Sequence, residues 1–209
     1  GWGRFAGDFF DGNRISVENH ALGGTSSRTF YRRLWPDVLE GVRAGDYVAI
    51  QFGHNDGGPY DEGRARASIA GTGRDSLEVT IKETGVHETV YSYGEYLRRY
   101  IREVRARGAT PVLVTLTPRN VWNDGKIERR ADTYGAWARE VARAEGVAFV
   151  DLTAVTADFF DSIGEEATAA YYHGDHTHTS KEGAVRNAQS FAEGLKASGI
   201  TLSNYLKTE

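Results

Sequence analysis

Short apolar runs alternate along the chain with longer amphipathic segments. Three runs are almost continuously apolar, as expected of strands buried on both faces of a sheet, and they span 46–52, 111–116 and 147–152. Apolar and polar residues alternate at 15–18, which predicts a further strand there. Bulky residues predict a short helix at 2–10, and apolar residues at helical spacing predict helices at 29–42, 93–107, 129–144 and 180–197.

The order of these elements predicts an α/β fold, with a central parallel sheet between two layers of helices. No repeat or linker interrupts the pattern, so residues 1–209 are expected to form a single domain. A polar, Gly-rich insertion at about 59–90 interrupts it, and 77–82 can pair with 86–91 as a hairpin. Ligands bind beyond the carboxyl ends of parallel strands. The loops expected at that edge are 19–28, 53–58, 117–125 and 173–178.

Composition excludes several classes of function. The formal net charge is −4 and no basic cluster stands out, which argues against nucleic acid or an anionic membrane as a partner. The chain has no cysteine, so disulfides, thiolate metal sites and a cysteine nucleophile are excluded. No apolar stretch is long enough to span a bilayer, and no signal peptide is visible.

The loop before the last predicted helix carries an acid three residues ahead of a histidine, Asp175 and His178. Such an acid can orient the imidazole and stabilise its charge, so that the histidine acts as a general base toward a nucleophile. A polar surface turn would give the same short pattern. A metal site using His173 and His176 is a third interpretation, but no carboxylate or cysteine from another element supports it.

Two other loops offer hydrogen-bond donors. Asn55 follows the strand expected at 46–52, where its side-chain amide could donate to a developing oxyanion, although Gly, Asn and Asp are also common in turns. Gly24 lies in a strand-to-helix loop, where it offers a free N–H and lets a ligand approach the backbone. An ordinary glycine-containing loop with a Ser or Thr helix cap would have the same sequence.

Taken together and in chain order, these motifs resemble the SGNH hydrolase superfamily, and within it the rhamnogalacturonan acetylesterase family. The resemblance rests on a G-x-S-S-R-[ST]-F loop at 24–30, on Gly-His-Asn-Asp at 53–56 and on D-x-T-H-x-S at 175–180. It covers nearly the whole chain, because further matches lie at 1–3, 51–52, 71–73, 93–98, 117–120 and 122–126.

The resemblance implies a serine esterase that removes O-acetyl groups from plant cell-wall polysaccharide of the rhamnogalacturonan or pectin type. His178 would be the base and Asp175 its orienting partner, while the Gly24 N–H and the Asn55 amide would stabilise the oxyanion. No metal or other cofactor is expected. A polymeric substrate of this kind also implies secretion or a periplasmic location.

Three further residues on the pocket-side loops are expected to touch the sugar: Trp122, Arg119 and Asp56. Core packing is the alternative for Trp122, and simple solvation is the alternative for Arg119. The sequence does not identify the polysaccharide, the acetylated position or the oligomeric state.

One part of the family pattern is not in the chain. The family's nucleophile is the serine of a Gly-Asp-Ser that ends the first strand, upstream of the Gly-Trp-Gly matched here by residues 1–3. Gly7-Asp8-Phe9 lacks the hydroxyl, and Ser26 and Ser27 belong to the loop that matches the oxyanion position. Without such a serine the 209-residue chain would be inactive.

We therefore expect the parent protein to carry about 15–30 more N-terminal residues, the usual size of one strand and its loop. The chain has no Met, even at position 1, which fits the loss or omission of a preceding segment. In this fold the first strand lies between the strands expected at 14–18 and 46–52. Removing it would leave buried backbone groups unpaired, at about 1–3 kcal/mol each.

Two other functions stay open. One is a catalytically silent relative that binds acetylated sugar, and the other is a small-ester lipase or thioesterase of the same superfamily. The intact Asp175, His178, Asn55 and Gly24 favour an active enzyme. The polar insertion at 59–90 argues against a fatty-acyl substrate.

Overall fold

The computed structural model describes residues 1–208, which divide into two compact units. The sheet unit comprises 22–116 and 131–149, and the terminal unit comprises 1–21, 117–130 and the chain from 150 onward. Each unit is described by itself. That the whole chain forms one domain stays a prediction.

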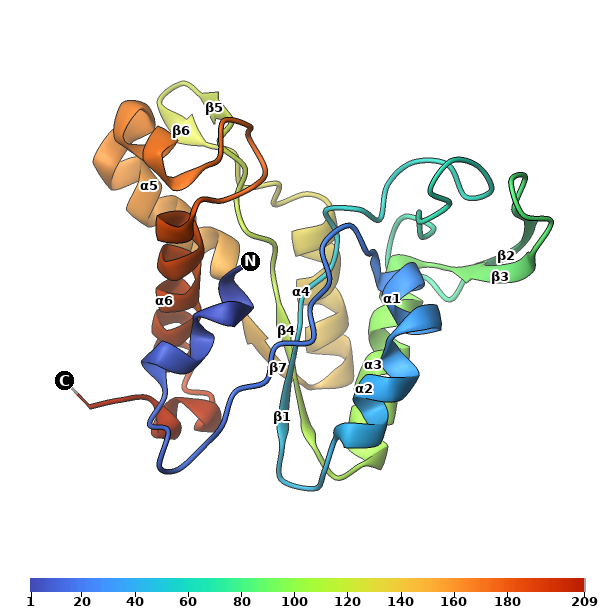
Figure 1. The fold of residues 1–209 in the computed structure, drawn as a ribbon, viewed down its shortest axis with the longest axis horizontal. Coiled ribbons are helices and arrows are strands. Elements are labelled where there is room, and N and C mark those ends of the chain that lie inside the picture. The colour runs from blue at the N-terminus through green and yellow to red at the C-terminus, as the bar shows by residue number, and fades with distance from the viewer. Residues whose placement is uncertain (209) are drawn as a thin grey trace. The chain divides into compact units, whose positions relative to one another are not determined.

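A parallel sheet forms the centre of the sheet unit (Figure 1). Its strands are β1 (Tyr47–Ile50), β4 (Thr110–Val114) and β7 (Ala148–Val150), in the order β1-β4-β7. β1 and β4 are parallel, with Tyr47 opposite Thr110 and Ile50 opposite Leu113. The three runs predicted to be buried strands are therefore strands, and the α/β class with a parallel sheet flanked by helices is confirmed.

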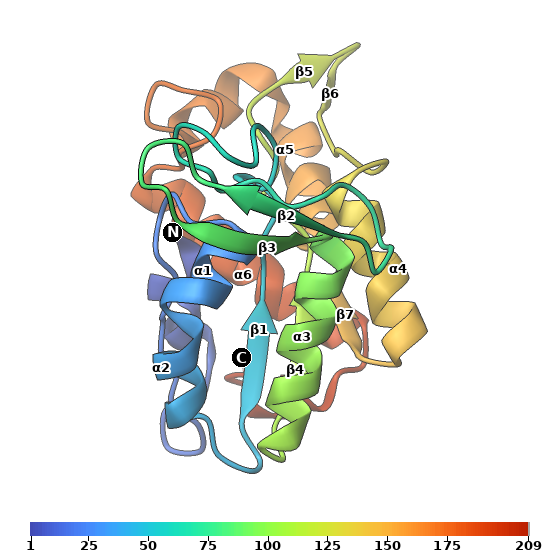
Figure 2. The ribbon, with the colours of Figure 1, turned by 90° about the vertical axis from the view of Figure 1, so that its right-hand side faces the viewer.

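Four helices belong to the sheet unit, and Figure 2 shows α1 and α2 on one side of β1 and α3 on the other, with α4 beyond α3. They are α1 (Ser27–Arg33), α2 (Trp35–Gly41), α3 (Tyr93–Ala106) and α4 (Tyr134–Glu145). The face of α3 that carries Tyr93, Leu97, Tyr100, Ile101 and Val104 is buried, and the aromatic rings of Phe30 and Trp35 lie in the same core cluster. Burial of this apolar face drives the helix onto the sheet.

The insertion ends in the predicted hairpin. β2 (Ser76–Thr80) and β3 (His87–Tyr91) are antiparallel, with Ser76 opposite Tyr91. Val79, Ile81 and Val90 form a small core of their own with Ala65.

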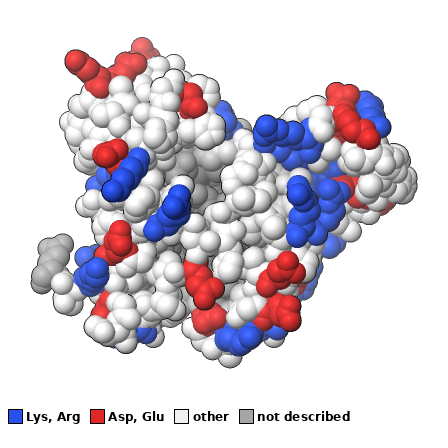
Figure 3. Space-filling view, in the orientation of Figure 1, with Lys and Arg blue, Asp and Glu red and all other residues white. Residues whose placement is uncertain are grey.

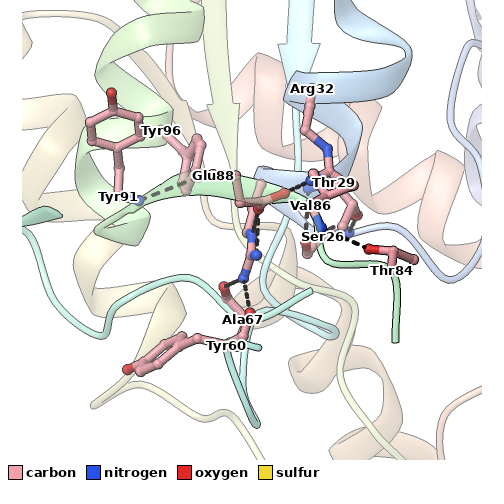
Figure 4. A network of polar contacts seen from close by, with 11 residues as sticks. Ser26, Thr29, Arg32, Tyr60, Ala67, Thr84, Val86, Glu88, Tyr91 and Tyr96 are labelled. Atoms are coloured by element: carbon pink, nitrogen blue, oxygen red, sulfur yellow. Dashed lines mark hydrogen bonds and ion pairs between the residues drawn. The ribbon is translucent and has the colours of Figure 1, made fainter. Parts of the chain in front are cut away.

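A polar network joins the insertion to α1, and Figure 4 shows Arg32, Glu88, Tyr60 and Ala67 gathered in it. Arg28 is 1% exposed, and its Nη1 donates to the carbonyls of Tyr60 at 2.8 Å and Ala67 at 2.9 Å. Its Nε and Nη2 contact the carboxylate of Glu88 on β3, which also pairs with Arg32. One guanidinium therefore joins three separate segments of the chain.

The terminal unit is built mainly from two helices, α5 (Leu152–Thr168) and α6 (Lys181–Ala197). Trp2 packs its ring on Phe191 of α6, with centroids 4.8 Å apart. The smaller elements are 3-10 turns at Trp2–Arg4, Ala6–Phe9, Ala169–Tyr171 and Thr201–Tyr205, and a hairpin of β5 (Trp122–Asn123) and β6 (Lys126–Ile127).

Several element predictions were wrong. Residues 15–18 form no strand, because they have no pairing partner among residues 1–208 and Val17 is 40% exposed. The helix expected at 29–42 is interrupted at Leu34, since Pro36 lies in the first turn of α2, where it lacks the N–H that a continued α1 would require. α4 begins at Tyr134, five residues later than 129.

α5 was not predicted at all. Its buried face includes Thr153, Thr156 and Thr168 among apolar residues, so the apolar stripe is broken in the sequence. β-branched residues also lower helix propensity. Asp151 caps the N-terminus of α5, because its carboxylate accepts a hydrogen bond from the Ala154 N–H at 3.1 Å.

Candidate active site

Asp175 and His178 meet on the loop between the turn at Ala169–Tyr171 and α6. The His178 Nδ1 lies 2.7 Å from Asp175 Oδ2. Asp175 Oδ1 accepts the N–H groups of His178 at 2.7 Å and Thr177 at 2.6 Å. The backbone N–H of His178, its ring and the Thr177 N–H together hold the pKa of Asp175 well below its usual range. The carboxylate therefore stays charged at any physiological pH.

This geometry selects the tautomer of His178. A charged carboxylate can only accept a hydrogen bond, so the facing Nδ1 must carry the hydrogen. In the neutral ring, Nε2 then has the lone pair. The His178 side chain is 79% exposed, so Nε2 is open to a reacting group. The pair can therefore take up a proton at Nε2 and stabilise the imidazolium that results.

The histidine loop is held from two sides. The His173 N–H donates to the His178 carbonyl at 2.8 Å, and the Asn120 N–H donates to the His176 carbonyl at 2.8 Å. The Trp122 Nε1 donates to Asn120 Oδ1 at 2.8 Å. The structure thus brings the 117–125 segment beside the 173–178 loop, as the sequence predicted for two strand-end loops.

Trp122 and Arg119 lie on this neighbouring segment. Trp122 is half-buried, and part of its side chain packs against a cluster that contains Ile127, Phe160 and Tyr172. Arg119 has a buried Nε with no hydrogen-bond partner among residues 1–208. Burial lowers the pKa of its guanidinium, and the nearby Arg130 lowers it further. The acid Glu128, which lies nearby, acts on this pKa in the opposite direction.

Gly24 and Asn55 meet in the sheet unit. The Asn55 Nδ2 donates to the carbonyl of Thr25 at 2.9 Å, which fixes the amide beside the Gly24 loop. Gly24 has φ +82, a conformation that suits glycine, and its N–H has no acceptor within residues 1–208. Two N–H donors are therefore placed on two neighbouring loops, an arrangement that could stabilise an oxyanion.

Asp56 has a different role from the one expected. It is completely buried, and it accepts the N–H of Ser27 at 3.1 Å, the Ser27 hydroxyl, and the Ser68 hydroxyl at 3.1 Å. Burial raises the pKa of Asp56 to about 6 and outweighs these hydrogen bonds, which act in the opposite direction. Asp56 fixes the start of α1, and a polysaccharide cannot reach it.

The hydroxyls of Ser26 and Ser27 are also internal. Ser26 caps α1 by accepting the Thr29 N–H at 3.1 Å, and Ser27 bonds to Asp56; both residues are 0% exposed. Neither hydroxyl is open to a substrate. Among residues 1–208, no group of three or more His, Cys, Asp or Glu side chains could hold a metal ion.

Sequence reasoning missed two arginines close to Gly24. The Arg66 Nη1 donates to the Gly24 carbonyl at 2.9 Å, and a Cβ placed on Gly24 would lie 3.8 Å from Arg64 Nη1. Both arginines belong to the polar insertion, which has no periodicity to indicate where its side chains point. Their Arg-x-Arg spacing was the only signal.

Comparison with known proteins shows the family of the chain. The sequence model of the GDSL-like lipase/acylhydrolase family matches residues 1–186. The chain belongs to that family. As a GDSL-like acylhydrolase it is a carboxylic ester hydrolase, and the expected superfamily is confirmed.

Curated relatives of this GDSL-like hydrolase include proteins named as rhamnogalacturonan acetylesterases. The rhamnogalacturonan acetylesterase of Emericella nidulans is 32% identical over 207 residues, which cover 99% of this chain and 82% of that protein. The probable rhamnogalacturonan acetylesterase YesY of Bacillus subtilis is 30% identical over 216 residues, covering 100% of this chain and 89% of the relative.

Solved structures share the fold. Protein YxiM of Bacillus subtilis superposes with a TM-score of 0.77 at 28% identity, covering 96% of this chain and 51% of that one, so the hydrolase spans about half of YxiM. Axe2, an acetylxylan esterase from Geobacillus stearothermophilus, gives a TM-score of 0.57 at 20% identity, covering 92% of this chain and 75% of Axe2. No helix in the described part of the hydrolase is long and apolar enough to cross a membrane.

Proposed function

We propose that this hydrolase is a carbohydrate acetylesterase that releases acetate from O-acetylated plant cell-wall polysaccharide of the rhamnogalacturonan or pectin type. The observation that carries the proposal is the Asp175–His178 pair, with its hydrogen bond of 2.7 Å and an open Nε2. Relatives named as rhamnogalacturonan acetylesterases support the substrate class. A polymer of this kind also favours secretion or a periplasmic location.

The proposed reaction runs through a Ser-His-Asp triad whose serine precedes residue 1. As the serine oxygen bonds to the acetyl carbon, its proton passes to His178 Nε2 and the carbonyl electrons move onto oxygen. When the tetrahedral intermediate collapses, the bond to the sugar oxygen breaks and that oxygen takes the proton from His178. Water repeats the sequence and releases acetate. Asp175 keeps Nδ1 protonated and stabilises the imidazolium.

Gly24 and Asn55 are the proposed donors to the oxyanion. The Gly24 N–H has no acceptor in the described chain, and the Asn55 amide is already oriented by Thr25. Fixed donors need no reorganisation as charge develops, and each contributes about 10²–10³-fold in rate. Trp122 and Arg119 are the proposed sugar contacts on the neighbouring segment.

The test uses the full-length natural protein and two histidines of one loop. His178→Asn should lower kcat for acetate release from acetylated rhamnogalacturonan and from p-nitrophenyl acetate by about 10²–10⁴-fold. His176→Asn is the matched control, because His176 is exposed on the same loop and its ring bonds only Thr177 among residues 1–208. It should retain wild-type rates.

A fluorophosphonate probe, followed by mass spectrometry of the labelled peptide, locates the nucleophile. Binding of acetylated oligosaccharide without acetate release or labelling would instead support a silent relative. A preference for long acyl chains over acetyl would support a lipase or thioesterase.

A further inference from the structure

Two guanidinium groups of the insertion converge on the proposed oxyanion glycine. An ideal Cβ built on Gly24 would lie 3.8 Å from Arg64 Nη1 and 4.0 Å from Arg66 Nη1. Ala65, between them, is buried in the small core of the insertion. Its burial leaves the two flanking arginines free to lie toward Gly24.

The two arginines differ in their existing contacts. Arg66 is half-buried and donates to the Gly24 carbonyl at 2.9 Å. Arg64 is exposed, and it has no hydrogen bond or ion pair with any residue from 1 to 208. Two like charges this close repel each other unless an anion lies between them.

The acids nearby are already engaged. Glu62 pairs with Lys82 at 2.7 Å, and Glu83 Oε1 accepts the Gly63 N–H at 2.6 Å. The arginines border an open hollow of about 470 Å³, whose lining also includes Gly57, Pro59 and the two acids Glu62 and Glu83. Basic side chains gather over α1 and the adjoining part of the insertion in the space-filling view (Figure 3). The hollow thus holds both acids and both arginines, but the acids are bonded to Lys82 and to the Gly63 N–H rather than to Arg64 or Arg66.

We propose that Arg64 and Arg66 form a subsite for the carboxylate of a uronic acid in the acetylated polysaccharide. Guanidinium donors match the two oxygens of a carboxylate, and arginine is weakly hydrated, so such contacts are selective. The subsite would place an acetyl group of the same or an adjacent sugar near the Gly24 N–H. This inference rests on the proposed function. It adds that the preferred substrate carries a negative charge, which the subsite recognises.

The test compares three substrates with the full-length protein: acetylated polygalacturonate, the same polymer with its carboxylates methyl-esterified, and neutral acetylated xylan. The wild type should favour the acidic polymer over its methyl ester by about tenfold or more in kcat/KM, since hydrogen bonds to charged groups have at least that effect. Arg64→Gln should reduce this preference about tenfold, mainly through KM. Arg66→Gln should also reduce it, and Arg66→Lys should retain part of it.

Arg102→Gln is the control, because Arg102 is exposed on α3 and takes no part in the proposed subsite. Equal rates on all three polymers, or an unchanged preference in Arg64→Gln, would overturn the subsite and leave the acetylesterase standing. A wild type that releases no acetate from these polymers or from p-nitrophenyl acetate would overturn the proposed function, and the subsite with it.

Discussion

Replacing Arg28 by methionine should strongly destabilise the sheet unit. The change keeps the length and apolar stem of the side chain but removes its charge. It leaves the carbonyls of Tyr60 and Ala67 without the donor they use at 2.8 Å and 2.9 Å. It also leaves the carboxylate of Glu88, which is only 9% exposed, with Arg32 as its one remaining basic partner.

The magnitude follows from these losses. Breaking a buried ion pair by removing one partner costs about 3–5 kcal/mol, because a charge is left buried without compensation. The remaining contact with Arg32 should place the result toward the lower end. A typical domain is stable by about 5–15 kcal/mol, so Arg28→Met should consume a large share of the free energy of unfolding.

Urea denaturation, followed by intrinsic fluorescence, measures this loss. Arg32→Met is the matched control: Arg32 pairs with the same Glu88 but is 46% exposed, so its removal should cost at most about 1 kcal/mol. The double variant Arg28→Met/Glu88→Met should recover much of the loss, because the buried carboxylate that has lost Arg28 is removed as well. A loss below about 1 kcal/mol in Arg28→Met, or no recovery in the double variant, would refute the reasoning.

Three further predictions concern Asp175, Asn55 and Asp56. Asp175→Asn should lower kcat by about 10²–10⁴-fold through loss of the charged partner of His178, and a pH–rate profile on p-nitrophenyl acetate would show whether an essential basic group persists. Asn55→Ala should lower kcat by about 10²–10³-fold with little change in KM; an unchanged kcat would exclude it as an oxyanion donor. The raised pKa of Asp56, about 6, means that the folded state binds more protons than the unfolded state between about pH 4 and 6. The free energy of unfolding of the wild type should therefore fall by up to about 3 kcal/mol relative to that of Asp56→Asn as pH rises through that window. Urea denaturation of both proteins at pH 4 and pH 7 measures this, and an equal difference between them at the two pH values would contradict it.

The elements that the sequence predicted well are those whose apolar pattern is strong. The buried strands β1, β4 and β7, and the helices α3 and α6, all follow from continuous or helical apolar spacing. α5 was missed because threonines interrupt its buried face. Residues 15–18 were assigned to a strand because alternation alone cannot show whether a pairing partner exists.

The candidate site was predictable in part for a related reason. Asp175 and His178 are close in sequence, so their contact follows from local geometry. Asn55 follows β1 and Gly24 precedes α1, and the fold brings these two loops together. The role of Asp56 was not predictable, because its partner Ser27 is 29 residues away and burial decides its function. Arg64 and Arg66 lie in an insertion without periodicity, so only coordinates place them.

The contacts of Arg28 have a consequence for recognition. Its guanidinium binds the carbonyls of Tyr60 and Ala67, which stand at the two ends of the stretch that carries Arg64 and Arg66. One side chain therefore closes this stretch into a loop, much as a covalent cross-link would, and narrows the range of shapes open to it. The entropy of ordering the loop is lost during folding rather than on contact with sugar, so a ligand would meet a surface already in its binding shape. Selectivity at an exposed, glycine-rich insertion would then depend on a residue that no ligand touches.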